Sequence, residues 1–197
     1  MKNLVIAFLF TVSLAALSYS QTSGQLVSTG NVHNGQKPRI AVLEFNVEPG
    51  ASSMPANGRQ SVQSSIIGVL RKAGKFDVIG VDPSAAAVRA LYKSLLGRPV
   101  DPAAAVKIGK VLGVGYVMTG AVTKFGVTDN GTHLGLSAQI VNVSDGKVAW
   151  VDKGDHTDSS LTKAGTGRLV LANSSASTLL VPAVQKLTAS LKPADLP

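Results

Sequence analysis

The stretch of sequence that decides the fold is GVGYVMTGAVTKFGVTDNGTHLGLSAQIVNVSDGKVAW, residues 113–150. Its first part is an apolar run between glycines, and we predict a buried strand from Tyr116 to Phe125. An alternating run follows, whose apolar positions are Leu134, Leu136, Ala138 and Ile140. Such alternation is typical of a half-buried strand, so we predict a second strand from Leu134 to Val143.

Asp145-Gly146 comes directly after that strand, and this dipeptide is a strong signal for a tight turn. We therefore predict a third strand, from Lys147 to Asp152, that pairs with the second. No residue of the stretch has the character of a catalyst. Three consecutive strands of this kind indicate a docking or assembly domain rather than an enzyme.

Upstream of this stretch the sequence predicts a β-α-β unit. Residues 39–47 are rich in β-branched and aromatic side chains, which is typical of a buried strand. A helix is predicted over 59–73, ended by Gly74, because apolar residues recur there at helical spacing: Val62, Ile66, Ile67 and Leu70. A second strand is predicted over 76–81. The two strands should be parallel and the crossover right-handed.

Two dipeptides, Asp82-Pro83 and Asp101-Pro102, are typical helix starts, with Asp as the N-cap and Pro at the first helical position. We predict that the first helix runs to about Leu96 and the second to about Leu112. A last helix is predicted from about 166 to 191, and Pro182 would kink or split it. Its predicted packing residues are Leu169, Leu171, Leu179, Leu180, Val184 and Leu187.

The predicted order is strand, helix, strand, two helices, three strands and a helix. It implies an α/β fold, a mixed β-sheet with an N-terminal β-α-β unit, a C-terminal antiparallel hairpin and packed helices. We expect one α/β domain over 39–192, preceded by a flexible leader over 21–38 and followed by a short tail over 193–197. Residues 1–20 are expected to be a signal peptide.

The signal peptide is predicted from the order of residues at the N-terminus. Lys2 precedes an apolar run, Leu4 to Leu17, and the small or polar Ser18-Tyr19-Ser20 follows. The run is too short for a transmembrane helix of ~20 residues. We expect export with cleavage near Ser20 or Gln21, and a place in the periplasm or at the periphery of the outer membrane.

Composition narrows the classes of partner. Cysteine is absent, so there is no thiol for a disulfide, a thiolate metal site or lipid attachment. The formal net charge is +8, which favours association with phospholipid headgroups, lipopolysaccharide or cell-wall polymers. The basic residues are scattered, aromatic residues are not interleaved with them and no recognised nucleic-acid motif appears, so we expect no nucleic-acid partner.

Parts of the chain resemble the CsgG-like family of bacterial envelope proteins, which includes the curli assembly component and LpoB-like and FlgO-like relatives. The segments that carry the resemblance are 40–45, 76–79, 109–120 and 139–148. It covers roughly 39 to 155 and is strongest from 109 to 150. The resemblance implies a domain that binds a protein partner in curli-type secretion or in the activation of a cell-wall synthase.

The chain departs from the family's secretion channel, which is a lipoprotein and inserts two long hairpins per subunit into the membrane. Only Gly126 to Thr132 separates two predicted core strands, and Asp152 to Gly167 is polar and short. We therefore expect the soluble family domain, without the pore-forming hairpins and not lipidated.

An enzymatic alternative rests on Ser160 and Lys163, which have the S-x-x-K spacing of penicillin-recognising serine acylases. The companion motifs Ser-Asp-Asn and Lys-Thr-Gly are absent from the sequence. The histidines His33, His133 and His156 lack metal-ligand spacing, and Asp152, Asp155 and Asp158 lack the glycine and glutamate of a calcium loop. We expect no catalytic residue, no cofactor and no metal site.

The sequence thus predicts an exported, non-enzymatic CsgG-like protein that binds an envelope protein in the assembly of the cell envelope or of a surface structure. Lys107 and Lys110 are the candidate partner-binding residues, because they lie three apart on one helix face near the family-like segment. An anionic envelope surface is a second expected partner. The alternatives are a serine acylase or other hydrolase using Ser160 and Lys163, and a homo-oligomeric ring subunit.

Overall fold

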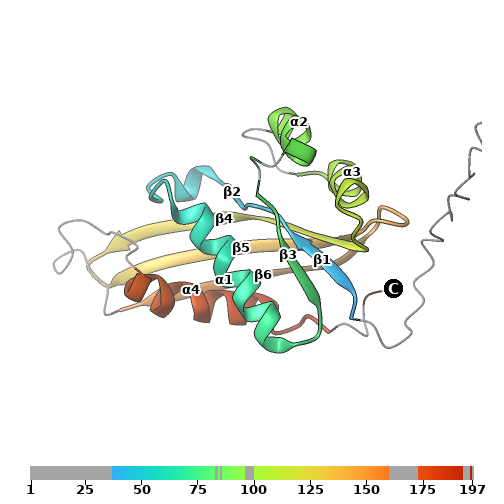
Figure 1. Ribbon diagram of the computed structural model, residues 1–197. Helices are drawn as coiled ribbons and strands as arrows, with labels where there is room; N and C mark the ends of the chain where they lie inside the picture. The colour runs from blue at the N-terminus through green and yellow to red at the C-terminus, as the bar shows by residue number, and fades with distance from the viewer. Residues whose placement is uncertain are drawn as a thin grey trace, which may run out of the picture.

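The computed structural model describes residues 37–82, 84, 86–95, 100–159, 173–192 and 196. Six strands form one mixed sheet in the order β3-β1-β4-β5-β6, with the short β2 paired to β4 (Figure 1). The predicted α/β class, with parallel strands at one side of the sheet and antiparallel strands at the other, is confirmed.

The predicted first strand is interrupted. β1 (Arg39–Val42) and β2 (Asn46–Val47) both pair in parallel with β4. Between them the amide of Leu43 still donates to the carbonyl of Met118, at 2.9 Å. A short 3-10 helix, Pro49–Ala51, follows β2.

The predicted β-α-β helix and its second strand are both present. α1 (Gly58–Ala73) ends at Gly74, whose φ of 69° provides the left-handed cap that was predicted. β3 (Asp77–Gly80) pairs in parallel with β1, as expected. The buried amide of Gln63 on α1 donates to the carbonyls of Val42 and Val81, both at 2.9 Å, and so ties the helix to the ends of both strands.

α2 (Ala86–Leu95) begins later than Asp82-Pro83 predicted. The Asp82 carboxylate accepts from the amide of Ser84 at 2.8 Å, so this aspartate closes a turn ahead of the helix instead of capping it. Hydrogen bonds from Ser84 also hold the pKa of Asp82 below its usual value. The Asp101 prediction is confirmed, because its carboxylate accepts from the amide of Ala104 at 2.7 Å at the start of α3 (Pro102–Leu112).

The long strands extend well beyond their predicted ends. β4 (Tyr116–Thr128) and β5 (Gly131–Asn142) form a hairpin joined by Asp129-Asn130, so the prediction that 126–132 separates the two strands was wrong. β6 (Val148–Asp158) likewise continues through a segment that was predicted to be polar loop after Asp152. Glycine and polar residues suggested loops there, yet backbone pairing along the hairpin continues through them.

The turn between β5 and β6 is wider than a two-residue hairpin. Gly146 has a φ of 72°, as an Asp-Gly turn requires, but no residue other than glycine has a positive φ among the described residues. Asp145 therefore cannot occupy the first position of a type I′ turn. The Asn142 side chain instead accepts from the amide of Ser144 at 2.9 Å and organises a longer turn.

α4 (Asn173–Thr188) contains Pro182 inside one continuous helix, so the proline does not split it. The predicted packing residues that lie in the described part are all buried: Leu179, Leu180, Val184 and Leu187. Leu169 and Leu171 lie outside the described residues. Gly154 of β6 allows α4 to approach closely, since a Cβ there would lie 2.5 Å from the carbonyl oxygen of Ala183.

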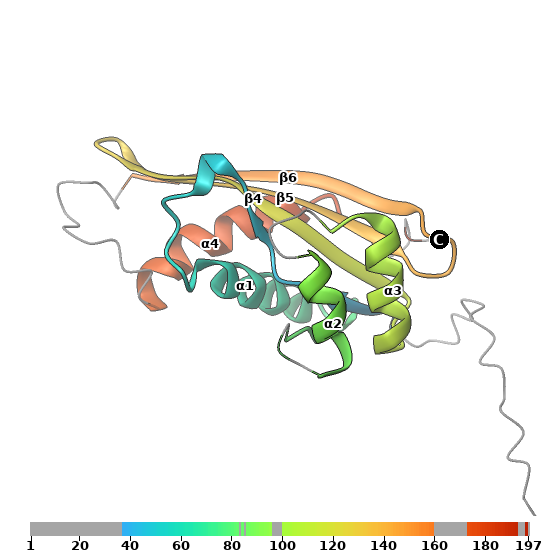
Figure 2. The same ribbon diagram turned by 90° about the horizontal axis from the view of Figure 1, so that it is seen from above.

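The sheet has a separate apolar core on each side. α1 and α4 lie side by side along the long strands and cover the first core (Figure 2). On the other side α2 and α3 cover a smaller core over β1, β3 and the beginning of β4. The helices of this second side leave the remainder of β4, β5 and β6 without a helical layer among the described residues.

Candidate functional site

The candidate site is the part of the sheet that α2 and α3 leave uncovered, which we call the open face. Strand register brings its side chains into rows, such as Thr119, Gln139 and Val151, and then Ala121, Ser137 and Lys153. Their neighbours in sequence, such as Leu136 and Ala138, point to the opposite side and are buried under α1 and α4. The open face is defined by Thr119, Ala121, Thr123, Gly135, Ser137, Gln139, Val151, Lys153 and Asp155.

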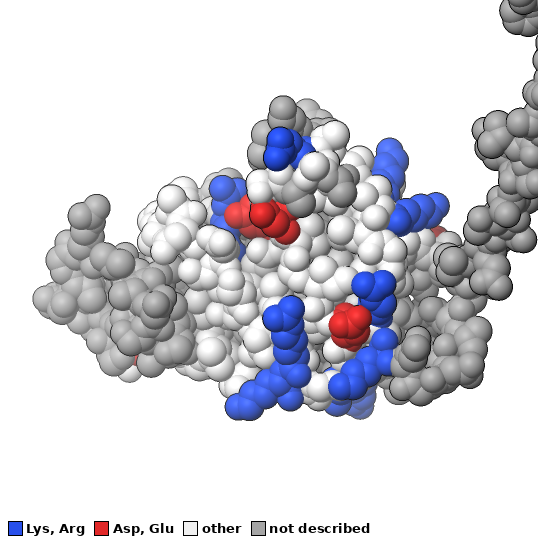
Figure 3. Space-filling view, in the orientation of Figure 1, with Lys and Arg blue, Asp and Glu red and all other residues white. Residues whose placement is uncertain are grey.

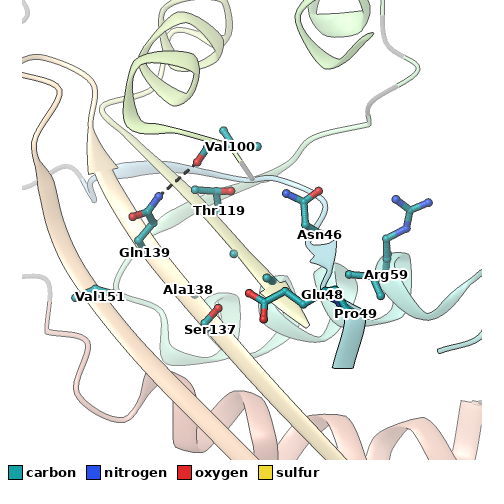
Figure 4. A pocket seen from close by; sticks show the side chains of 13 residues that line it. Asn46, Glu48, Pro49, Arg59, Val100, Thr119, Ser137, Ala138, Gln139 and Val151 are labelled. Carbon is teal, nitrogen blue, oxygen red and sulfur yellow. Dashed lines mark hydrogen bonds between the residues drawn. The ribbon is translucent and has the colours of Figure 1, made fainter. Parts of the chain in front are cut away.

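A pocket of about 410 Å³ lies between the open face and the segment around β2 (Figure 4). The amide of Gln139 spans part of it and donates to the carbonyl of Val100 at 3.5 Å. Glu48 extends its carboxylate into the pocket from the other side. The lining residues are Asn46, Val47, Glu48, Pro49, Arg59, Val100, Thr119, Gly120, Ala121, Ser137, Ala138, Gln139 and Val151.

Small and polar side chains give this pocket its chemistry. Ser137 and Gln139 are half-buried, and Thr119 is only 2% exposed. Glu48 is exposed at the rim, and Arg59 is paired with Glu44 at 3.8 Å. The pocket can therefore accept hydrogen bonds and hold a positively charged or polar group against Glu48.

The same lining lacks the arrangement that nucleophilic catalysis needs. Ser137 lies in the pocket, but the described lining residues include no histidine, lysine or cysteine. A serine nucleophile needs an adjacent general base that is itself oriented by a third group.

β6 borders the open face and is the last strand of the sheet. It pairs with β5, and within the described part of the chain no strand pairs with its outer edge. Val151 is 67% exposed on this strand and also lines the pocket. An exposed edge beside a pocket is suited to the addition of an extended segment from another chain.

The two lysines predicted to bind a partner do not belong to the pocket. Lys107 and Lys110 are both exposed on α3, on one face that also carries Val111, which is 51% exposed. Sequence reasoning selected them from helical spacing and from their place near the family-like segment. It missed the open face, although the small and polar Gly135, Ser137 and Gln139 between the apolar positions of β5 were a visible signal.

The other predicted candidates are dispersed. Ser160, Lys163 and His33 lie outside the described residues. His133 in β5 bonds the hydroxyl of Thr157 at 2.8 Å. The aspartates at 152, 155 and 158 lie on β6 and not in a loop, and Asp152 bonds Ser190 on the α4 side.

Over the described ranges, no group of three or more His, Asp or Glu side chains is placed to hold a metal ion. No helix of the described chain is both long enough and apolar enough to span a membrane.

Comparison with known proteins finds likeness in structure only. No protein-family model matches the chain, and no curated protein matches it significantly in sequence. A solved structure of the PelC dodecamer from Paraburkholderia phytofirmans superposes with a TM-score of 0.53 and 17% identity, covering 79% of this chain and 89% of PelC. This likeness shows the fold alone, because so few residues are shared.

Two further solved structures are similar at lower TM-scores. The lipoprotein GNA1162 from Neisseria meningitidis has a TM-score of 0.46 and 19% identity, over 78% of this chain and 99% of that one. The C-terminal domain of LpoB from Salmonella enterica has a TM-score of 0.41 and 18% identity, over 64% and 87%.

Proposed function

We propose that this chain is an exported, non-enzymatic protein that binds a protein partner during assembly of the cell envelope or of a surface structure. The observation that carries the proposal is the open face, with a pocket between it and the segment around β2 and with the edge of β6 at its border. The expected signal peptide and the fold shared with PelC support it.

The partner that fits this surface is an extended polypeptide segment. Such a segment would add to β6 as a further strand, with backbone hydrogen bonds giving affinity. The side chains of this segment that lie on the open-face side of the sheet would extend past Val151 into the pocket, where Glu48 favours a basic residue. The proposal covers a partner that acts in curli-type secretion and one that acts in the activation of a cell-wall synthase.

The test is a crosslinking pull-down from envelope fractions. Ser137→Tyr should fill the pocket and abolish recovery of the partner, while Ser64→Tyr on the exposed outer side of α1 should leave recovery unchanged. Thermal melting of both variants checks that they are folded. Recovery of the same partner by folded Ser137→Tyr protein would remove the open face from the interface.

Absence of catalysis is a separate part of the proposal. We expect that Ser160→Ala leaves biological activity intact and that a fluorescent penicillin does not label the protein. Labelling that disappears in Ser160→Ala or Lys163→Ala would establish the hydrolase alternative.

A homo-oligomeric ring is the second candidate function, and the likeness to the PelC dodecamer favours it. In that case the segment that occupies the β6 edge belongs to another copy of this chain. Sedimentation equilibrium of the purified protein distinguishes the two, since a monomeric mass at micromolar concentration excludes a stable ring.

Export is tested at the N-terminus. Protein from the extracytoplasmic fraction should begin near Ser20 or Gln21 when it is sequenced. Intact Met1 in the cytosol would contradict export, whatever the open face binds.

A further inference from the structure

The C-terminal ends of α1, α3 and α4 and the beginnings of β1, β3 and β4 lie at one end of the molecule. The parallel register of β1 with β3 and β4 places the beginnings of these strands together. α3 ends here too, since the Arg39 guanidinium donates to the carbonyl of Gly113 at 3.0 Å. α4 also finishes near this end, where the Trp150 indole donates to Ser190 at 3.0 Å.

Exposed cations gather at this end, which we call the basic end (Figure 3). Among the described residues the carboxylates near this end are Asp77, Asp145 and Asp152. Asp77 pairs with Arg39 at 3.2 Å, Asp145 pairs with Lys147 at 3.9 Å, and Asp152 accepts from the hydroxyl of Ser190. The cations of the basic end are Lys37, Arg39, Arg71, Lys72, Lys75, Lys107, Lys110, Lys147 and Lys192, all of them exposed.

Helix ends explain only part of this accumulation. A helix C-terminus attracts cations into its last turn, and Arg71 and Lys72 occupy the last turn of α1 and Lys110 that of α3. The other cations of the basic end lie outside these last turns, so the helix dipoles do not account for them. Neither α1 nor α4 contains an acidic residue to offset them.

Apolar side chains are exposed among these cations. Val111 follows Lys110 on α3 and is 51% exposed, and Val148 follows Lys147 at the start of β6 and is 44% exposed. A basic surface with interspersed exposed apolar side chains suits the headgroup region of an anionic bilayer, which offers both negative charge and an apolar layer beneath it. A soluble acidic polymer offers only the charge.

We propose that the basic end docks on the surface of an anionic phospholipid bilayer. Each Lys or Arg near such a surface strengthens binding roughly fivefold at physiological salt, so the array suffices for reversible attachment without a spanning helix or a lipid anchor. This gives Lys107 and Lys110 a role at the bilayer and leaves the open face available for a protein partner. The proposal goes beyond the proposed function and does not depend on it.

The first experiment measures co-sedimentation of the secreted protein with vesicles. Wild type should bind vesicles of phosphatidylcholine mixed with phosphatidylglycerol and not vesicles of phosphatidylcholine alone. Lys72→Glu with Lys110→Glu should weaken binding at least about tenfold. The control, Lys124→Glu with Lys153→Glu, changes the net charge equally, away from the basic end, and should have an effect of less than about threefold.

Equal losses in the two double variants would show that only net charge matters and would overturn the proposal. Thermal melting confirms that each variant is folded. Partner recovery in the pull-down should be unaffected by the basic-end substitutions, so a failure of vesicle binding and a failure of the proposed function can be told apart.

The second experiment separates a bilayer from an acidic polymer. Val111→Ser with Val148→Ser should weaken vesicle binding severalfold and leave binding to dextran sulfate unchanged. If these substitutions leave vesicle binding unchanged while wild type binds dextran sulfate at least as tightly as vesicles, the basic end recognises a polyanion and the bilayer proposal is wrong.

Discussion

The two sides of β5 show how one strand serves two purposes. On one side Leu134, Leu136 and Ile140 are buried beneath α1 and α4. On the other side Gly135, Ser137 and Gln139 lie on the open face, beside a pocket, and no helix of the described residues covers them. The buried side therefore determines the fold, and substitutions on the open side should change binding with little effect on stability.

The contrast is sharpest between two adjacent residues of β5. Leu136→Ala removes a side chain that is 1% exposed and should lower the free energy of unfolding by about 2–5 kcal/mol. Ser137→Ala should change it by less than about 0.5 kcal/mol. Chemical denaturation of both variants measures the difference, and similar losses would show that the open face is also part of the core.

Two glycines give a second pair of substitutions. Gly154 packs against α4, whereas Gly126 has open space beside it. A Cβ at Gly154 would lie 2.5 Å from the Ala183 carbonyl oxygen, whereas a Cβ at Gly126 meets nothing within 4 Å. Gly154→Ala should destabilise the protein by about 1–3 kcal/mol because α4 must move away from the sheet. Gly126→Ala serves as the matched control, and thermal melting with no difference between them would argue against this close approach.

The turn that joins β5 to β6 depends on a glycine with a positive φ. Gly146 has a φ of 72°, a region that a β-branched residue occupies poorly. Gly146→Val should therefore lower stability by more than ~1 kcal/mol. An unchanged melting temperature would mean that the turn can relax to another conformation.

A modest loss of stability is expected at the helix that borders the open face. Asp101 caps α3 through a 2.7 Å hydrogen bond to the amide of Ala104, and Asp101→Ala should cost about 1 kcal/mol. Asp101→Asn keeps an acceptor and should be nearly neutral. Equal melting temperatures for the alanine and wild-type proteins would contradict a stabilising cap.

Local signals in the sequence predicted much of the fold. Asp101 and Gly74 marked helix ends that the structure confirms, because capping depends on a few neighbouring backbone groups. The alternation from Leu134 to Ile140 correctly identified a half-buried strand. These features are determined within a few residues and can be read without tertiary contacts.

Strand lengths and the candidate site could not be predicted in the same way. Gly126 and Gly131 are weak strand formers, and pairing with a neighbouring strand holds them in the hairpin. The pocket combines Glu48, Val100 and Gln139, which are distant in sequence and meet only through the sheet and the loop before α3. Lys107 and Lys110 were selected by spacing, and the structure adds the surrounding cations of the basic end.

Partner binding at the open face is tested most directly by photocrosslinking in the native envelope. A photoreactive amino acid would replace Val151, which lines the pocket and is 67% exposed, and Ser64 on the exposed outer side of α1 in a control. The account predicts a discrete crosslinked product from position 151, with a second envelope protein or with another copy of this chain, and none from position 64. A discrete product from position 64 and none from position 151 would contradict it.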